Sequence, residues 1–291
     1  MKRGSRTDGR KQPVGQSLRE YARGVAGGLL FSLPLLYTME VWWAGFIARP
    51  LHLLFYFAAG FLLLFGYNRY AGLHEDASWL EVAFEAVEEM GLGLLLAAVF
   101  LWLLGQIDSG IPLPEILGKV VVEGVTAAIG VSVGSAQLGG NGEGEGEERH
   151  QGMAGRETPG IPGQLVLAAC GAVLFASNVA PTEEIVMIAV ESSPAKILGL
   201  ALLSLLLGGI VLFSSGFRGS KRLTPDEHRG PFTILSRTVV NYAVALVASA
   251  FILWFFGRFD GMPASMCAAQ MIVLGVAASL GASAGRLLVQ S

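Results

Sequence analysis

Long apolar stretches separated by short polar ones dominate the chain, without the short alternating pattern of barrel strands. Most of these stretches are near or above the roughly 20 residues that cross a bilayer as a helix. Backbone polar groups find no water in hydrocarbon, so the stretches must be helical. The pattern predicts an all-α membrane protein with eight transmembrane helices, at residues 24–48, 51–67, 81–107, 113–138, 162–190, 195–217, 234–258 and 263–289.

The first half of the chain recurs in the second half in three collinear blocks. These are residues 38–41 with 182–185 at an offset of 144 (184 − 40), 101–108 with 253–260 at an offset of 152 (254 − 102), and 124–134 with 275–285 at an offset of 151 (275 − 124). Chance seldom produces three blocks in order at a nearly constant offset. The similarity therefore predicts two tandem copies of a four-helix unit.

Four spans per copy would bring both copies into the membrane from the same side, as parallel repeats about a pseudo-two-fold axis along the membrane normal. Matching elements should then face each other. Gly130 and Gly134, with their counterparts Gly281 and Gly285, lie four residues apart, a spacing that lets two helix backbones approach closely. The predicted organisation is a basic tail at 1–23, a repeat at 24–138, a flexible Gly/Glu-rich linker at 139–161 and a repeat at 162–291.

Composition supports a lipid-embedded chain, because 53% of its residues are hydrophobic and only 15% are charged, against roughly 25% charged in soluble domains. Nothing in it favours nucleic-acid binding. Cys170 and Cys267 lie in apolar stretches without a neighbouring ligand, so neither a disulfide nor a zinc site is predicted. No enzyme signature motif is present, and we expect neither catalysis nor a cofactor.

The distribution of lysine and arginine among the connecting segments predicts the orientation of the chain in the membrane. The N-terminal tail and the loop after the sixth apolar stretch are basic, and cytoplasmic segments retain such residues, so both chain termini are expected in the cytoplasm. The basic positions are Lys2, Arg3, Arg6, Arg10, Lys11, Arg19, Arg23, Arg218, Lys221, Arg222 and Arg229.

Glu40 is the strongest candidate for a functional residue, and Glu184 is its counterpart in the second copy. If the first apolar stretch is one helix, Glu40 lies roughly 14 Å before Arg49, near the middle of a bilayer core of about 30 Å. A carboxylate at that depth must be protonated, paired, hydrated or bound to an ion. Such a pair near one axis predicts ion or proton handling. The alternative is that two protonated carboxyl groups hold helices together.

Residues around these carboxylates favour a cation site. Thr38 and Thr182 offer hydroxyl groups, and Pro34 and Pro181 each remove a backbone donor, which frees a carbonyl group and breaks the helix. Asn178 and Glu183 add oxygen atoms in the second copy. The identity of any metal stays open.

The third apolar stretch begins with an acidic face, which is interpreted as the solvated start of a long helix or as a vestibule for cations. Within it, Glu89 is equivalent to the polar residue Asn241, so Glu89 and Asn241 are further candidates. Glu123 is a weaker candidate, because its counterpart Leu274 is apolar.

Residues 174–185, together with the segment 32–40, resemble a bacterial family of integral membrane proteins without assigned function, domain-of-unknown-function family 2391. The similarity extends from about residue 20 to the C-terminus. It implies the bacterial inner membrane as location. It implies no activity, and no functional residue can be carried over from it.

Three functional hypotheses remain. The first is a transporter or channel for a cation or protons that uses the paired carboxylates. The second is a membrane scaffold or assembly subunit without transport activity, and the third and weakest is an intramembrane enzyme. The expected partners are the lipid bilayer and a small cation or protons, and the sequence leaves a homo-oligomer open.

Overall fold

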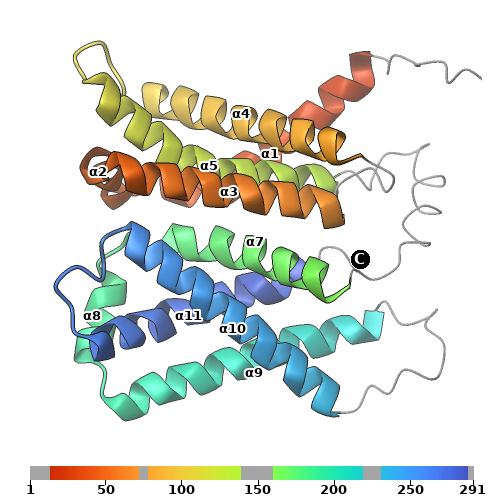
Figure 1. Cartoon of the computed structure of the whole chain (residues 1–291), viewed down its shortest axis with the longest axis vertical. Helices are drawn as coiled ribbons and strands as arrows, with labels where there is room; N and C mark the ends of the chain where they lie inside the picture. Colours follow the sequence, from red (N-terminus) through yellow and green to blue (C-terminus); the bar gives the residue numbers. More distant parts are fainter. Residues whose placement is uncertain (1–13, 72–77, 139–159, 219–230, 288–291) are drawn as a thin grey trace, which may run out of the picture.

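The computed structural model describes residues 14–71, 78–138, 160–218 and 231–287, and this part of the chain is helical between its turns and contains no strand (Figure 1). The helices are α1 (Val14–Leu36), α2 (Met39–Ile47), α3 (Pro50–Ala71), α4 (Trp79–Leu103), α5 (Leu113–Leu138), α7 (Ile161–Val179), α8 (Glu184–Glu191), α9 (Pro194–Arg218), α10 (Pro231–Phe255) and α11 (Ala264–Leu287). By length and apolar composition, seven of these can cross a membrane, or eight segments if the bent pair α1 and α2 counts as one. The prediction of an all-helical membrane protein is confirmed.

Several predicted features fall outside the described residues. They are most of the basic positions that predict the orientation, and nearly all of the Gly/Glu-rich linker. One boundary differs within the described part, because α1 begins at Val14, inside the stretch that the sequence assigns to the N-terminal tail.

Helices α1 to α5 form a first half and α7 to α11 a second half, with the same order of one long, one short and three long helices. In the first half α5 packs against α1, α2, α3 and α4, and in the second half α11 packs against α7, α8, α9 and α10. The short helices α2 and α8 lie at the same end of the molecule, which we call the short-helix end (Figure 1). Helix α5 is the most enclosed candidate span.

Helices α4 and α10 end in the same way. Gly105 and Gly257 adopt positive φ angles of 70° and 68°, which a glycine reaches without steric cost. The N–H of Gln106 bonds the carbonyl of Leu101, and the N–H of Arg258 bonds that of Leu253. These are Schellman caps, which satisfy carbonyl groups left open at a helix end.

The first predicted span is not one continuous helix. The chain breaks after Leu36, and α2 leaves α1 at an angle of 86°. Pro34 lies in the last turn of α1, where its ring cannot continue the hydrogen-bond ladder. The depth calculated for Glu40 from a straight helix is therefore wrong. The fifth predicted span also divides, into α7 and α8 on either side of Pro181.

Glycine residues bring backbones together within each half. A Cβ atom on Gly27 of α1 would lie 2.4 Å from the Cα of Gly134, and one on Gly171 of α7 would lie 2.1 Å from the carbonyl oxygen of Gly281. Gly130 and Gly285 line the same two crossings. The partner of each glycine stripe is thus the first helix of its own half, rather than the matching stripe.

The two halves do not face each other through matching helices. They meet chiefly through α3 and α7, with further contacts from α5 and α1 to α7. A two-fold axis would also bring α9 against α1, whereas α9 lies at the far edge of the second half (Figure 1). The expected two-fold arrangement is therefore wrong, because repetition of sequence constrains the helices inside a half but not the surface through which halves dock.

Candidate functional site

Glu123 lies on α5 in the interior of the first half, and none of its surface is exposed. Ten residues separate it from the start of α5 at Leu113, or about 15 Å of helix, which is half of a bilayer core. The indole of Trp42 lies beside it, but that N–H donates to the carbonyl oxygen of Leu36 at 3.1 Å. Neither carboxyl oxygen of Glu123 has a hydrogen-bond partner among the described residues.

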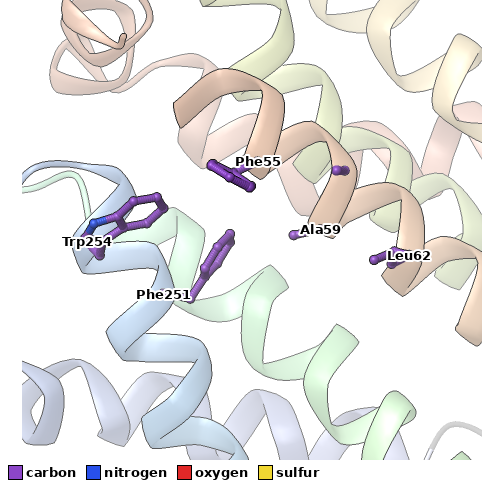
Figure 2. Close-up of a pocket in the computed structure, with 6 residues that line it drawn as sticks. Phe55, Ala59, Leu62, Phe251 and Trp254 are labelled. Carbon is purple, nitrogen blue, oxygen red and sulfur yellow. The ribbon is translucent and has the colours of Figure 1, made fainter. Parts of the chain in front are cut away.

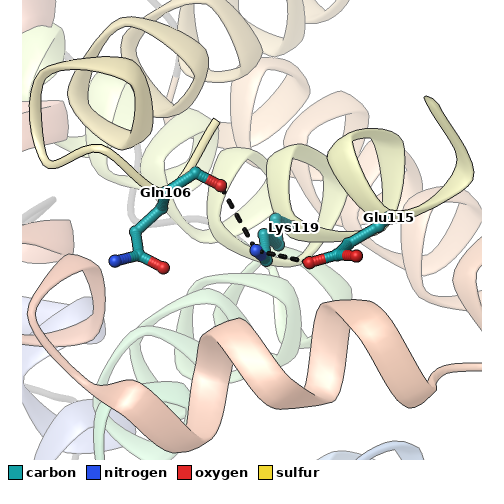
Figure 3. Close-up of polar contacts among 3 residues, drawn as sticks. All are labelled: Gln106, Glu115 and Lys119. Atoms are coloured by element: carbon teal, nitrogen blue, oxygen red, sulfur yellow. Dashed lines mark hydrogen bonds and ion pairs between the residues drawn. The ribbon is translucent and has the colours of Figure 1, made fainter. Parts of the chain in front are cut away.

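One turn closer to the short-helix end, α5 carries a buried cation. The ammonium group of Lys119 lies 2.8 Å from the Glu115 carboxylate and donates to the carbonyl oxygen of Gln106 at 3.2 Å (Figure 3). Lys119 is 6% exposed. The spacing of Glu115, Lys119 and Glu123 by four residues places all three on one face of α5. An alternating row of charges therefore leads from the helix start to mid-depth.

The same face continues with hydroxyl groups. Thr126, three residues beyond Glu123, shares a hydrogen bond of 3.0 Å with the hydroxyl of Tyr56 on α3, and both residues are buried. The Tyr56 ring stacks on Phe255 of α10, with centroids 4.1 Å apart. This hydroxyl pair therefore lies where the first half meets the second.

A third carboxyl group, that of Glu89, lies toward the opposite end. Asn68 of α3 donates from Nδ2 to Oε2 of Glu89 on α4 at 2.7 Å and accepts a hydrogen bond from Ser132 of α5 at 2.8 Å. Asn68 and Ser132 are buried. Three helices are thus joined by one hydrogen-bonded group. We call the set from Glu115 to Glu89 the polar column: Glu115, Lys119, Glu123, Thr126, Tyr56, Ser132, Asn68 and Glu89.

Asn68→Leu is expected to lower the free energy of unfolding by about 1 to 3 kcal/mol, because it removes the amide that bonds both the buried hydroxyl of Ser132 and an oxygen of Glu89. Thermal unfolding in detergent measures the change. Ser204→Ala on α9 is the control, since that hydroxyl bonds only the carbonyl of Leu200 in its own helix. Equal loss in both variants would contradict a joining role for Asn68.

Glu40 lies in the first turn of α2, half-buried, and belongs to the short-helix end. Thr38 precedes α2, and its hydroxyl donates to the carbonyl of Pro34 at 2.6 Å rather than to a carboxylate. Glu40 and Glu184 occupy different halves, because α2 packs on α5 and α8 packs on α11.

Glu184 begins α8, beyond the end of the α7 span, and is exposed. A hydrogen bond from its own backbone N–H, then the Thr182 hydroxyl, and more weakly the charge of Arg258, hold the pKa of Glu184 below its ordinary value. Its carboxylate is therefore ionised at neutral pH. Glu183 is exposed beside it.

Asn178 and Asn241, two asparagines predicted as candidates for the ion or proton site, lie on different helices of the second half. Asn178 of α7 donates to the carbonyl oxygens of Phe31 in α1 and Leu174 in α7, at 3.0 and 2.7 Å, and so links the halves. Its own carbonyl oxygen is buried and without a partner among the described residues. Asn241 is buried in α10, far along the chain from its counterpart Glu89 on α4.

Reasoning from the sequence missed Glu115, Lys119, Tyr56, Thr126, Asn68 and Ser132. One signal was available, since a lysine and two glutamates recur at intervals of four residues inside an apolar stretch. The priority given to residues shared by both halves concealed this signal. At an offset of 151, Lys119 corresponds to Gln270 and Glu123 to Leu274, so the second half lacks both charges.

Comparison with known protein families identifies the chain as an integral membrane protein. A family model described as "Putative integral membrane protein (DUF2391)" matches residues 20–289. Neither a curated protein nor a solved structure matches the chain. Since the family match covers nearly all of the sequence, and the helices are long and apolar enough to cross a bilayer, the chain belongs to this family of integral membrane proteins.

Proposed function

We propose that the protein carries protons across the membrane along the polar column of its first half, with Glu123 as the central proton acceptor. The observation that carries the proposal is the complete burial of Glu123 without a hydrogen-bond partner among the described residues. An ionised carboxylate in hydrocarbon is costly, and intramembrane acids that face the interior of a bundle characteristically mark ion pathways and proton relays.

A proton fits this column better than a metal cation does. Calcium takes six to eight oxygen ligands, and magnesium requires a near-octahedral set. The described residues contain no group of three histidine, cysteine, aspartate or glutamate side chains that could hold a metal. A proton needs only one carboxyl group at a time, linked to hydroxyl groups and water.

The groups of the polar column are spaced closely enough for a proton to pass between them, in part through water. Glu115 and Lys119 lead from the short-helix end to Glu123, and Thr126 lies about 4.5 Å further along the helix axis. Ser132 follows about 9 Å beyond Thr126, where the group of Asn68 and Glu89 begins. Transfer across that last interval requires bridging water, which hydrogen-bonds buried polar groups almost as well as a direct partner does.

One observation favours the scaffold hypothesis as the second candidate. Asn68 and Ser132 satisfy one another and Glu89, and such interhelical hydrogen bonds contribute about 0.6 to 2 kcal/mol each in membrane proteins. On that hypothesis the carboxyl groups only hold helices together. The same argument does not extend to Glu123, whose oxygen atoms bond nothing in the described residues.

Proton flux into liposomes tests the proposal. The purified protein is reconstituted with a pH-sensitive dye inside, and a potassium diffusion potential is imposed with valinomycin. We expect a pH change that protein-free liposomes lack, and no uptake of Na⁺, Mg²⁺, Ca²⁺ or Mn²⁺ when each is tested in turn. If the internal pH did not change with a potential of either sign, or with an imposed pH gradient, the result would contradict proton transport and favour the scaffold hypothesis.

We also infer that the two halves are tandem parallel copies. The similar order of helices, the same pairs packed on α5 and α11, and the same caps at Gly105 and Gly257 support it. Gly27 and Gly171, which bring the first helix of each half close to the backbone of α5 and of α11, are themselves separated by 144 residues. On this basis the column is a feature of one copy that its duplicate lacks.

The orientation also remains a proposal. We place the protein in the bacterial inner membrane with both chain termini in the cytoplasm, on the distribution of lysine and arginine. The short-helix end would then face away from the cytoplasm, and Glu115 would be the outer entrance of the column. Labelling of single cysteines from one side of the membrane, in a chain without Cys170 and Cys267, tests this placement.

A further inference from the structure

An apolar groove lies between α3 of the first half and α10 of the second, with a volume of about 480 Å³. Its lining consists of Phe55, Ala58, Ala59, Leu62, Phe251 and Trp254 (Figure 2). The two alanines leave space opposite Phe251, where larger side chains would close the gap. The volume is within the range of about 300 to 1,000 Å³ that is usual for small-molecule sites.

The groove lies at a definite depth in the candidate spans. Phe55 follows the start of α3 by five residues and Leu62 follows Phe55 by seven, so the groove extends roughly 11 Å along the helix, beginning about 8 Å from the short-helix end. An apolar cavity offers water no partners and does not hold it well. At this depth in a bilayer, the molecule available to fill it is a hydrocarbon chain.

The end of the groove nearest the short helices is basic. The His52 ring lies 4.7 Å from the Trp254 ring, which forms the groove wall. Arg49 immediately precedes α3, three residues before His52, and is exposed. Basic side chains at the level of the headgroups attract anionic lipids.

Arg258 lies four residues after Trp254, beyond the end of α10 at Phe255, and adds a third basic group near the short-helix end. It donates to the carbonyl oxygen of Pro181 and acts on the Glu184 carboxylate, so part of its charge is already engaged. Its Nε atom is buried without a partner among the described residues. Apolar walls with basic groups at the end nearest the short helices match the chemistry of a lipid that carries a phosphate. Arg69, beyond the other end of the groove on α3, is placed over the Trp79 ring of α4, 5.2 Å from its centroid.

We propose that this groove binds an anionic phospholipid, with one acyl chain between α3 and α10 and the phosphate at Arg49 and His52. The lipid would join the two halves of the chain, because each half supplies one wall of the groove. This inference stands apart from proton transport, since the groove and the polar column have no residue in common.

Thermal unfolding in detergent tests the site with three additions, which are phosphatidylglycerol, phosphatidylcholine and inorganic phosphate. Phosphatidylglycerol is expected to raise the wild-type Tm by several degrees, phosphatidylcholine by clearly less, and inorganic phosphate not at all. Ala59→Trp, which fills the groove, and the double variant Arg49→Gln/His52→Gln, which removes the basic end, should each lose most of the phosphatidylglycerol shift.

Two control variants should keep the full shift. Lys196→Gln removes a positive charge at the position of α9 that corresponds to His52, and Leu206→Trp adds bulk on an exposed face of α9. Native mass spectrometry should retain phosphatidylglycerol on the wild type and on the controls, but not on Ala59→Trp. Equal shifts from both phospholipids, or an undiminished phosphatidylglycerol shift in Ala59→Trp and in the double variant, would overturn the proposal. If Ala59→Trp fails to fold, the double variant decides the matter alone.

Discussion

Glu123→Leu is expected to reduce proton flux in liposomes to the level of protein-free controls. Along the column Glu115 lies nearer the short-helix end and Glu89 nearer the opposite end, so Glu123 is the carboxyl group between them. Leucine neither accepts nor donates a proton. Hydroxyl groups at Thr126 and Tyr56 remain in this variant but do not exchange protons readily at neutral pH. Flux driven by an imposed potential, normalised to the amount of protein incorporated, is the measurement.

The same substitution is expected to raise the free energy of unfolding by about 1 to 3 kcal/mol, because removal of a buried carboxyl without a partner relieves its desolvation cost. Leucine is the residue found at the corresponding position 274, where it is buried in α11. Loss of function with a gain in stability would separate a transport role from a structural one. A stable Glu123→Leu variant that keeps full proton flux would contradict the proposed path.

Gly171→Ala is expected to destabilise the protein by about 1 to 3 kcal/mol, the usual cost of inserting an extra carbon atom into a close-packed interior. Its Cβ would lie 2.1 Å from the carbonyl oxygen of Gly281, a backbone atom that moves only if α7 and α11 separate. These two helices form the largest contact in the second half, so we expect a clear fall in Tm.

Two other glycines provide the control. Nothing lies within 4 Å of a Cβ atom built on Gly91 of α4 or on Gly199 of α9. Gly91→Ala and Gly199→Ala should therefore leave Tm unchanged or raise it slightly, since alanine favours a helix by about 1 kcal/mol over glycine. A similar fall in all three variants would show that helix crossing at Gly171 is not the cause.

Apolar length and similarity between the halves predict much of the fold. Stretches of about 20 apolar residues have few options in a bilayer, so the number and approximate limits of the long helices follow from the sequence. The change of helix direction after Leu36 was harder to predict from the sequence. Proline weakens a helix locally but does not set the direction in which the chain continues, and the 86° turn depends on how α2 packs against α5.

Docking of the halves was not predictable from repetition. It depends on surface details that the halves do not share, such as Gly66 of α3, where a Cβ would lie 2.8 Å from Val166 of α7. Tyr56 stacks on Phe255 at the same junction. Such contacts favour α3 against α7 and α10, an arrangement without a two-fold axis.

The candidate site was only partly predictable, for a related reason. Comparison of the halves directs attention to positions where both carry polar residues, such as Glu40 with Glu184. The structure brings together residues from α3, α4 and α5 that lie far apart in sequence, including Asn68, Glu89 and Ser132. Glu123 and Lys119 have no charged counterpart, so repetition argued against them, whereas their burial in α5 makes them prominent.

Proton flux in two variants on one preparation tests the central claim most directly. Glu123→Gln keeps the shape of the side chain but removes the carboxyl group from the column. Glu40→Gln/Glu184→Gln removes both carboxylates at the helix breaks. We predict background flux in Glu123→Gln and at least half of the wild-type flux in the double variant. Full flux in Glu123→Gln with loss in the double variant would contradict the account and place the path at the helix breaks.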